Sequence, residues 1–107
     1  MTTVNIIESE DENKLLLTGH AGYGNSGTDI VCAAISTLAY TWINQLEKMK
    51  EENVVEEFEY QESDGLLFVR WKGKNKKIKH AFDTVNTGFL MLHDNFFENI
   101  RVIRGEI

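Results

Sequence analysis

The side chains best suited to carry out chemistry in this chain are His20 and Cys32, which flank a glycine-rich stretch. Half of the chain's eight glycines lie in or beside this stretch, namely Gly19, Gly22, Gly24 and Gly27. Glycine lets a backbone adopt unusual conformations and lets a ligand approach the main chain closely. A cysteine nucleophile with a histidine that acts as base and then as acid is a workable catalytic pair.

Cys32 is expected near the start of a helix, where free N–H groups and the positive end of the helix dipole favour an anion such as a thiolate. Backbone N–H groups at or beside Cys32 could then stabilise the oxyanion of a tetrahedral intermediate. The plainer alternative is an apolar core residue, since Cys32 is followed by Ala33-Ala34-Ile35. On residue type alone this alternative is the more frequent one, so the residues by themselves leave both open.

The same glycine-rich stretch could instead form a metal site or a dinucleotide site. A metal site built from His20, Asp29 and Cys32 would lack the paired Cys or His spacing that marks zinc sites. The segment 22–27 matches the G-x-G-x-x-G pattern of dinucleotide sites, but the elements after it read as a hairpin rather than a βαβ unit. Asp29 also places negative charge where a pyrophosphate would bind. No metal is therefore predicted, and phosphate binding is only a remote alternative.

The elements that must position these residues follow from the hydrophobic pattern. Two segments repeat apolar residues at alternating steps of four and three, the spacing of one helical face, and the others read as strands. Thr28 or Asp29 is the expected N-cap of the first helix, and the region of Asn75 or Lys76 opens the second. In chain order, the predicted elements are strands 4–8 and 14–20, a helix over 28–50, strands 54–61 and 66–72, a helix over 76–96 and a strand over 100–104. The order β-β-α-β-β-α-β predicts an α+β fold, a mainly antiparallel sheet with two helices.

The predicted strand 66–72 is apolar on both of its sides. Leu66 and Phe68 face one way, and the residues that alternate with them, Leu67, Val69 and Trp71, face the other. This pattern is expected where both faces of a strand are covered, and dimerisation would cover the second face.

The composition is that of a soluble globular domain, and residues 1–107 are expected to form a single domain. No stretch approaches the roughly 20 apolar residues needed to span a bilayer, and the N-terminus lacks the pattern of a secretory signal. The cytoplasm is therefore the expected location. A single cysteine excludes an internal disulfide and a zinc site built from cysteines.

The net charge of −6 argues against broad electrostatic binding to nucleic acid, so no direct nucleic-acid contact is expected. The charges are nevertheless clustered, and the preferred interpretation of both clusters is a solvated surface. A minority interpretation is that the basic cluster steers the protein towards an assembly that contains RNA. The basic cluster is Lys72, Lys74, Lys76, Lys77 and Lys79, and the acidic one is Glu51, Glu52, Glu56, Glu57 and Glu59.

The motif around the candidate pair resembles that of a known family. The runs Gly19-His20-Ala21 and Asp29-Ile30-Val31-Cys32-Ala33-Ala34-Ile35-Ser36 resemble the signature of the ribosomal-processing cysteine protease Prp, a small bacterial family. The spacing between His20 and Cys32 is also the family's spacing. The predicted order of elements extends the resemblance over essentially the whole chain.

The resemblance implies a homodimeric endopeptidase that needs no cofactor and removes a short N-terminal extension from a large-subunit ribosomal protein. His20 would be base and acid, and Cys32 the nucleophile. The loop that holds Gly22, Gly24 and Gly27 would be a mobile lid that orders on the substrate peptide. Asp29 and Ser36 match further positions of the motif, with Asp29 as a helix cap and the Ser36 hydroxyl lining the site.

The alternative class of function is non-catalytic. In that interpretation the chain is a dimeric module that binds ribosomal protein or RNA through its lysines, and Cys32 is a core residue. The reactivity of the Cys32 thiol discriminates between the two classes.

Overall fold

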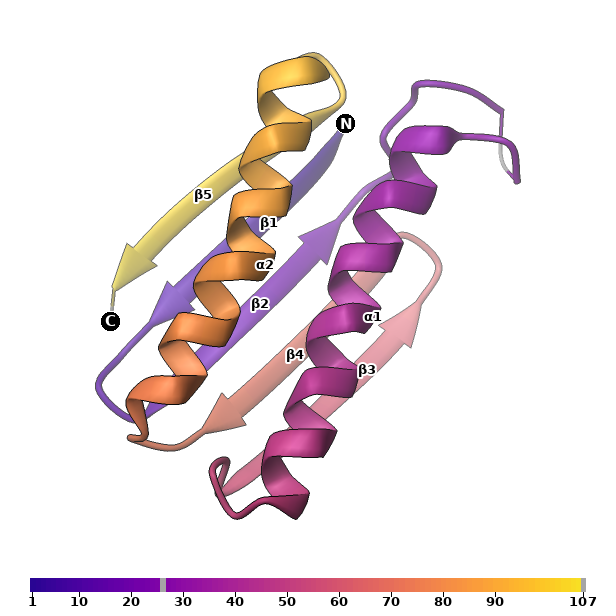
Figure 1. The fold of residues 1–107 in the computed structure, drawn as a ribbon. Coiled ribbons are helices and arrows are strands. Elements are labelled where there is room, and N and C mark those ends of the chain that lie inside the picture. The colour runs from indigo at the N-terminus through magenta and orange to yellow at the C-terminus, as the bar shows by residue number, and fades with distance from the viewer. Residues whose placement is uncertain (26, 107) are drawn as a thin grey trace.

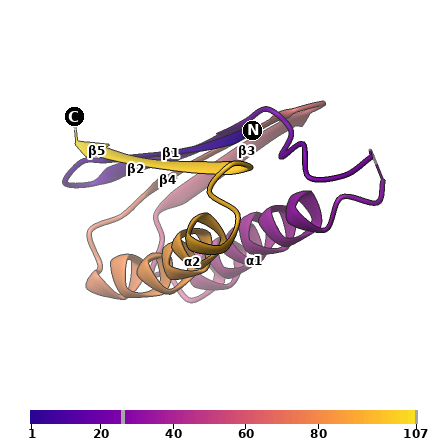
Figure 2. The ribbon, with the colours of Figure 1, turned by 90° about the horizontal axis from the view of Figure 1, so that it is seen from above.

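The computed structural model describes residues 1–25 and 27–106 as two layers, a five-stranded sheet with two helices on one of its faces (Figures 1 and 2). Ser26, in the predicted lid, and Ile107 lie outside the described residues. The predicted α+β class and element order are confirmed. The elements are β1 (Thr2–Glu8), β2 (Glu12–Thr18), α1 (Ile30–Glu51), β3 (Glu57–Ser63), β4 (Leu66–Lys72), α2 (Lys76–Asn95) and β5 (Ile100–Glu106).

The strands lie in the order β3-β4-β2-β1-β5. All neighbouring pairs are antiparallel except β1 and β5, which run parallel. The sheet is therefore mainly antiparallel, as predicted. The register of β2 and β4 pairs Leu15 with Val69 and Thr18 with Leu66. This register determines which residues meet where β2 ends and β4 begins.

The core lies between the sheet and the helices. Alternation in the strands turns one set of side chains, including Val4, Leu15 and Val69, towards the helices, where they are fully buried. The rings of Trp42, Trp71 and Phe82 fill one part of this layer, with centroids 5.0 to 5.1 Å apart. One face of α1 is buried against the sheet, as the helical spacing of its apolar residues predicts; its buried residues are Val31, Ile35, Ala39, Trp42, Ile43, Leu46 and Met49.

Gly88, the one glycine within the second helix, lies where the two helices approach each other. A Cβ at this position would be 2.5 Å from Leu38 Cδ2, so any larger residue would force Leu38 of α1 to move. The glycine lowers helix propensity but permits close packing of α1 on α2.

Most of the predicted element ends differ from those observed by one to three residues, among them ends of β2, β3 and β5. β2 ends at Thr18 rather than at residue 20, because Gly19 has a φ of +85° and turns the chain out of the sheet. β3 begins at Glu57 rather than at residue 54, because the N–H groups of Val54 and Val55 both donate to the carbonyl of Met49 and close the end of α1. The last strand extends beyond residue 104, to Glu106.

The glycine-rich stretch and the β3–β4 turn lie at one end of the sheet, and the β4–α2 connection lies at the other (Figure 1). Lys74, Lys76 and Lys77, in and just after that connection, are exposed. No helix in the described residues is both long and apolar enough to cross a membrane.

Candidate active site

Asp29 holds the start of α1 on which Cys32 lies. Its Oδ1 accepts hydrogen bonds from the backbone N–H groups of Val31, at 2.9 Å, and Cys32, at 3.0 Å. Of the two predicted caps, Asp29 rather than Thr28 is therefore the N-cap. Hydrogen bonds from backbone N–H groups, that of Cys32 foremost, lower the pKa of the Asp29 carboxyl below its ordinary value of 3.8.

The second oxygen of the same carboxylate binds the glycine loop, which we define as residues 19–28. Asp29 Oδ2 accepts from the N–H groups of Tyr23, at 2.9 Å, and Gly24, at 3.0 Å. N–H groups of the G-x-G-x-x-G segment thus bind a carboxylate of their own chain. Within residues 1–25 and 27–106, no three His, Cys, Asp or Glu side chains are grouped closely enough to hold a metal ion.

The thiol of Cys32 is half-buried and faces the first part of the glycine loop. The N–H of Ala21 donates to Cys32 Sγ at 3.3 Å. Ala21 is itself buried, and its carbonyl accepts from Asn99 Nδ2 at 3.0 Å. The Cys32 N–H, expected to stabilise an oxyanion, instead donates to Asp29. The Ala21 N–H is consequently the donor that is aimed at the sulfur.

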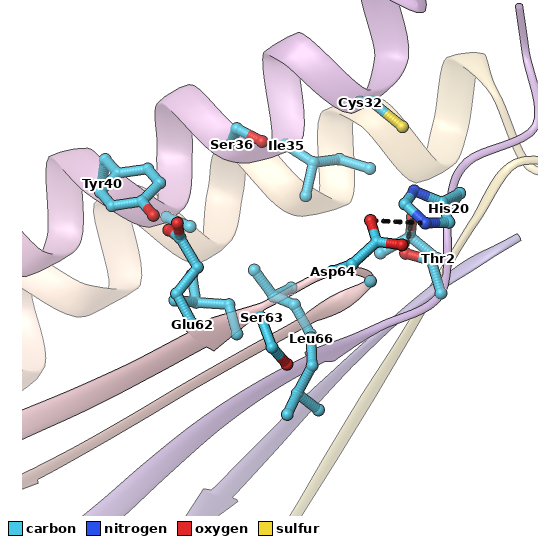
Figure 3. A pocket seen from close by; sticks show the side chains of 15 residues that line it. Thr2, His20, Cys32, Ile35, Ser36, Tyr40, Glu62, Ser63, Asp64 and Leu66 are labelled. Carbon is cyan, nitrogen blue, oxygen red and sulfur yellow. Dashed lines mark hydrogen bonds and ion pairs between the residues drawn. The ribbon is translucent and has the colours of Figure 1, made fainter. Parts of the chain in front are cut away.

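His20 follows β2 directly after the turn at Gly19. A Cβ on Gly19 would lie 2.5 Å from the Met1 carbonyl oxygen, so only glycine fits there. The Gly19 N–H donates to the Gly65 carbonyl at 2.8 Å, which continues the β2–β4 register by one residue. His20 therefore reaches the β3–β4 turn, where its Nε2 lies 3.4 Å from Asp64 Oδ1 (Figure 3).

Asp64 is a candidate site residue that the sequence did not reveal, because it lies between the predicted strands 54–61 and 66–72 and belongs to no motif. The signal that reveals Asp64 is the β2–β4 register, which a single sequence does not contain. Gly65 belongs to the same contact, since a Cβ there would be 3.3 Å from His20 Nε2. Asn99, which positions Ala21, was missed for the same reason: its contact spans most of the chain.

Two adjoining cavities open beside His20 and Cys32, and Ser36 and Asp64 also line both of them. The larger, of about 550 Å³, lies between α1 and the β3–β4 turn (Figure 3). The smaller, of about 400 Å³, lies over the glycine loop. The predicted site residues that line one or both cavities are His20, Gly22, Gly24, Gly27, Asp29, Cys32 and Ser36.

The arrangement suits attack by a thiol on a carbonyl carbon. Cys32 supplies the nucleophile, the His20 imidazole opens onto the same space and can carry a proton, and the Ala21 N–H can donate to developing negative charge near the sulfur. The Ser36 hydroxyl lies one helical turn beyond Cys32 along the same wall.

Comparison with known proteins agrees with this chemistry. Residues 1–101 match the model of a family described as cysteine protease Prp. The essential ribosomal processing protease Prp of S. aureus, solved with a covalently linked product peptide, is 24% identical with a TM-score of 0.81, over 97% of this chain and 99% of that one. The same protease solved with a substrate peptide is 23% identical with a TM-score of 0.75, at the same coverage.

The fold also resembles that of SMU.848 from Streptococcus mutans. This protein is 26% identical with a TM-score of 0.71, over 100% of this chain and 96% of that one. No curated protein matches the chain.

Proposed function

Since this chain belongs to the cysteine protease Prp family, we propose that it removes a short N-terminal extension from a large-subunit ribosomal protein. The chain is a cysteine protease. The observation that carries the proposal is the placement of His20 and Cys32 on one cleft large enough for a peptide. The fold is shared with a ribosomal processing protease that was solved with a product peptide and with a substrate peptide. Membership of a protease family argues against the non-catalytic alternative.

The proposed reaction begins with attack of Cys32 Sγ on the scissile carbonyl while His20 takes up the thiol proton. The tetrahedral intermediate collapses to a thioester as the C–N bond breaks, and His20 protonates the departing amine. A water molecule deprotonated by His20 then attacks the thioester, which releases the acid and regenerates the thiol. The Ala21 N–H and the Ser36 hydroxyl are the donors that we assign to the oxyanion. No cofactor takes part.

We assign Asp64 the role of orienting the imidazole. A contact from His20 Nε2 to the carboxylate leaves Nδ1 to accept the Cys32 proton, as the third member of a catalytic triad does. Both side chains are exposed, so the contact is weak until a substrate peptide covers it.

Asp64→Asn is expected to lower kcat about fivefold to tenfold and to leave KM nearly unchanged, because geometry rather than binding is lost. Steady-state kinetics on a cleaved peptide measures the two constants. Asp11→Asn, in the turn between β1 and β2, is the matched control. An unchanged kcat in Asp64→Asn would exclude the orienting role.

We further propose that the chain is a single domain that works as a homodimer in the cytoplasm, where a ribosomal precursor would be met. The sheet supports the dimer, since both helices cover the same face and the other face carries the paired residues Leu16 and Phe68 beside the exposed Leu66. Glycine-loop residues Gly22, Gly24 and Gly27 would order over the bound peptide.

Incubation with ribosomal precursors tests the proposed activity. Purified protein is mixed with candidate precursors of large-subunit proteins, and mass spectrometry reads the loss of an N-terminal fragment. We expect one precursor to be shortened at a single bond, and the Cys32→Ala protein to leave it intact. Cleavage that persists in Cys32→Ala, or no cleavage of any precursor, would refute the proposal.

A further inference from the structure

The larger cavity has a second end, away from His20 and Cys32, where Tyr40 and Glu62 face each other. Tyr40 extends from α1 and Glu62 from β3, and Figure 3 shows their polar ends pointing towards one another. Glu62 pairs in register with Leu67, which is buried, so it lies on the side of the sheet that faces α1. An aromatic ring and a carboxylate thus form the two walls of this end.

The fixed charges of the cavity are negative. Among the described residues, its lining includes the carboxylates of Glu62 and Asp64 but neither a lysine nor an arginine. Two other acidic residues of β3, Glu57 and Glu59, contact Arg70. In the part of the chain that the structure describes, no ion pair involves Glu62.

From this juxtaposition, and resting on the proposed function, we propose that Tyr40 and Glu62 bind a lysine or arginine side chain of the substrate peptide. A cation here would gain a charge-assisted hydrogen bond from the carboxylate and an electrostatic attraction to the tyrosine ring. It would also neutralise the carboxylate of Glu62. A substrate glutamate or aspartate would meet like charge at the same point.

The geometry also sets how far the bound side chain is from the bond that is cut. Cys32, Ser36 and Tyr40 are spaced four residues apart along α1 and line the same cavity. At about 1.5 Å per residue, Tyr40 lies about 12 Å beyond Cys32 along the helix, and an extended peptide rises about 3.3 Å per residue. The basic residue is therefore expected about three to four positions from the scissile bond.

Quenched fluorescent peptides built on the sequence that the protein cleaves test this subsite. Lysine, glutamine and glutamate are placed singly at each of the five positions on either side of the bond, and kcat/KM is measured for the wild type, Glu62→Gln and Glu62→Lys. Glu47→Lys is the matched control, because it makes the same charge change at an exposed position of α1 outside the cavity. Binding of the same peptides to Cys32→Ala, measured by fluorescence anisotropy, gives a readout that needs no turnover.

We expect the wild type to prefer lysine over glutamate by about tenfold at one position, three or four residues from the bond, and salt to weaken the preference. Glu62→Gln should abolish the preference for lysine, Glu62→Lys should reverse it in favour of glutamate, and Glu47→Lys should leave it unchanged. Cleavage with no charge preference, or the same preference in Glu62→Lys, overturns the subsite and leaves the protease proposal standing. Binding of basic peptides that depends on Glu62, without cleavage of any peptide by the wild type, supports the subsite and overturns the proposed function.

Discussion

Replacing either Cys32 or His20 is expected to lower kcat/KM for precursor cleavage by at least about a thousandfold, and replacing both should cost little more than replacing one. The two side chains act as one unit in the proposed reaction, since the thiol attacks only as its proton leaves for the imidazole. Cys32→Ser, His20→Ala and the double variant are compared by single-turnover cleavage. His20 is largely exposed and serine is close to cysteine in size, so thermal unfolding should change little.

The single cysteine allows a second measurement of the same pair. Iodoacetamide can alkylate only Cys32 among the thiols, so the mass increase of the protein reports its reactivity directly. We expect reaction at pH 6 to 7 to be faster than that of free cysteine, and His20→Ala to slow it. Thr37→Ala, on the exposed side of α1, is the control. Multiplicative losses in the double variant, or alkylation no faster than that of free cysteine, would contradict the assignment of the pair.

Replacing Asp29 should have the next largest effect on kcat/KM. Two substitutions separate its role as the cap of α1 from its contact with the glycine loop. In Asp29→Asn the remaining oxygen can still accept from Val31 and Cys32, but the new amide group would face the N–H groups of Tyr23 and Gly24. We expect Asn to retain most of the stability of the helix start and yet to lower kcat/KM about a hundredfold, because the loop beside the thiol shifts. Asp29→Ala should lose both stability and activity.

The matched control for Asp29 is Asn75, which caps α2 at the opposite end of the molecule. Asn75→Ala should lower the melting temperature without lowering kcat/KM. Melting curves and peptide cleavage for all three variants give the comparison. An Asp29→Asn protein with full activity would show that the link between the carboxylate and the glycine loop is not needed for catalysis.

The lowered pKa of Asp29 also predicts how the stability of the fold depends on pH. Its carboxylate stabilises the folded state fully above the ordinary value of 3.8, and that contribution is lost as the pH falls through the lower pKa of the folded protein. The stability of the wild type should therefore fall more steeply below pH 3.8 than that of Asp29→Asn, as acid unfolding followed by circular dichroism would show.

The local pattern of the chain predicted the elements and the fold class, and the motif around His20 and Cys32 predicted part of the cleft lining. The alternation of apolar residues in the strands and their helical spacing along α1 involve residues that are close in sequence. A single sequence is therefore enough to recognise them. Asp64 and Asn99 could not be found in this way, because each meets the site only through strand pairing or through contact between distant segments. The close packing at Gly88 was hidden for the same reason, since the partner that requires a glycine, Leu38, lies on the other helix.

The position of Asn99 has a consequence for the order in which the protein is made. Both members of the proposed pair lie in the first third of the chain, but the carbonyl of Ala21 is held by Asn99, and the Thr2 N–H donates to the carbonyl of the same residue. A nascent chain carries its thiol and imidazole early in translation and lacks the segment that fixes the Ala21 N–H against the sulfur. The site is therefore complete only when nearly the whole polypeptide has left the ribosome that is synthesising it.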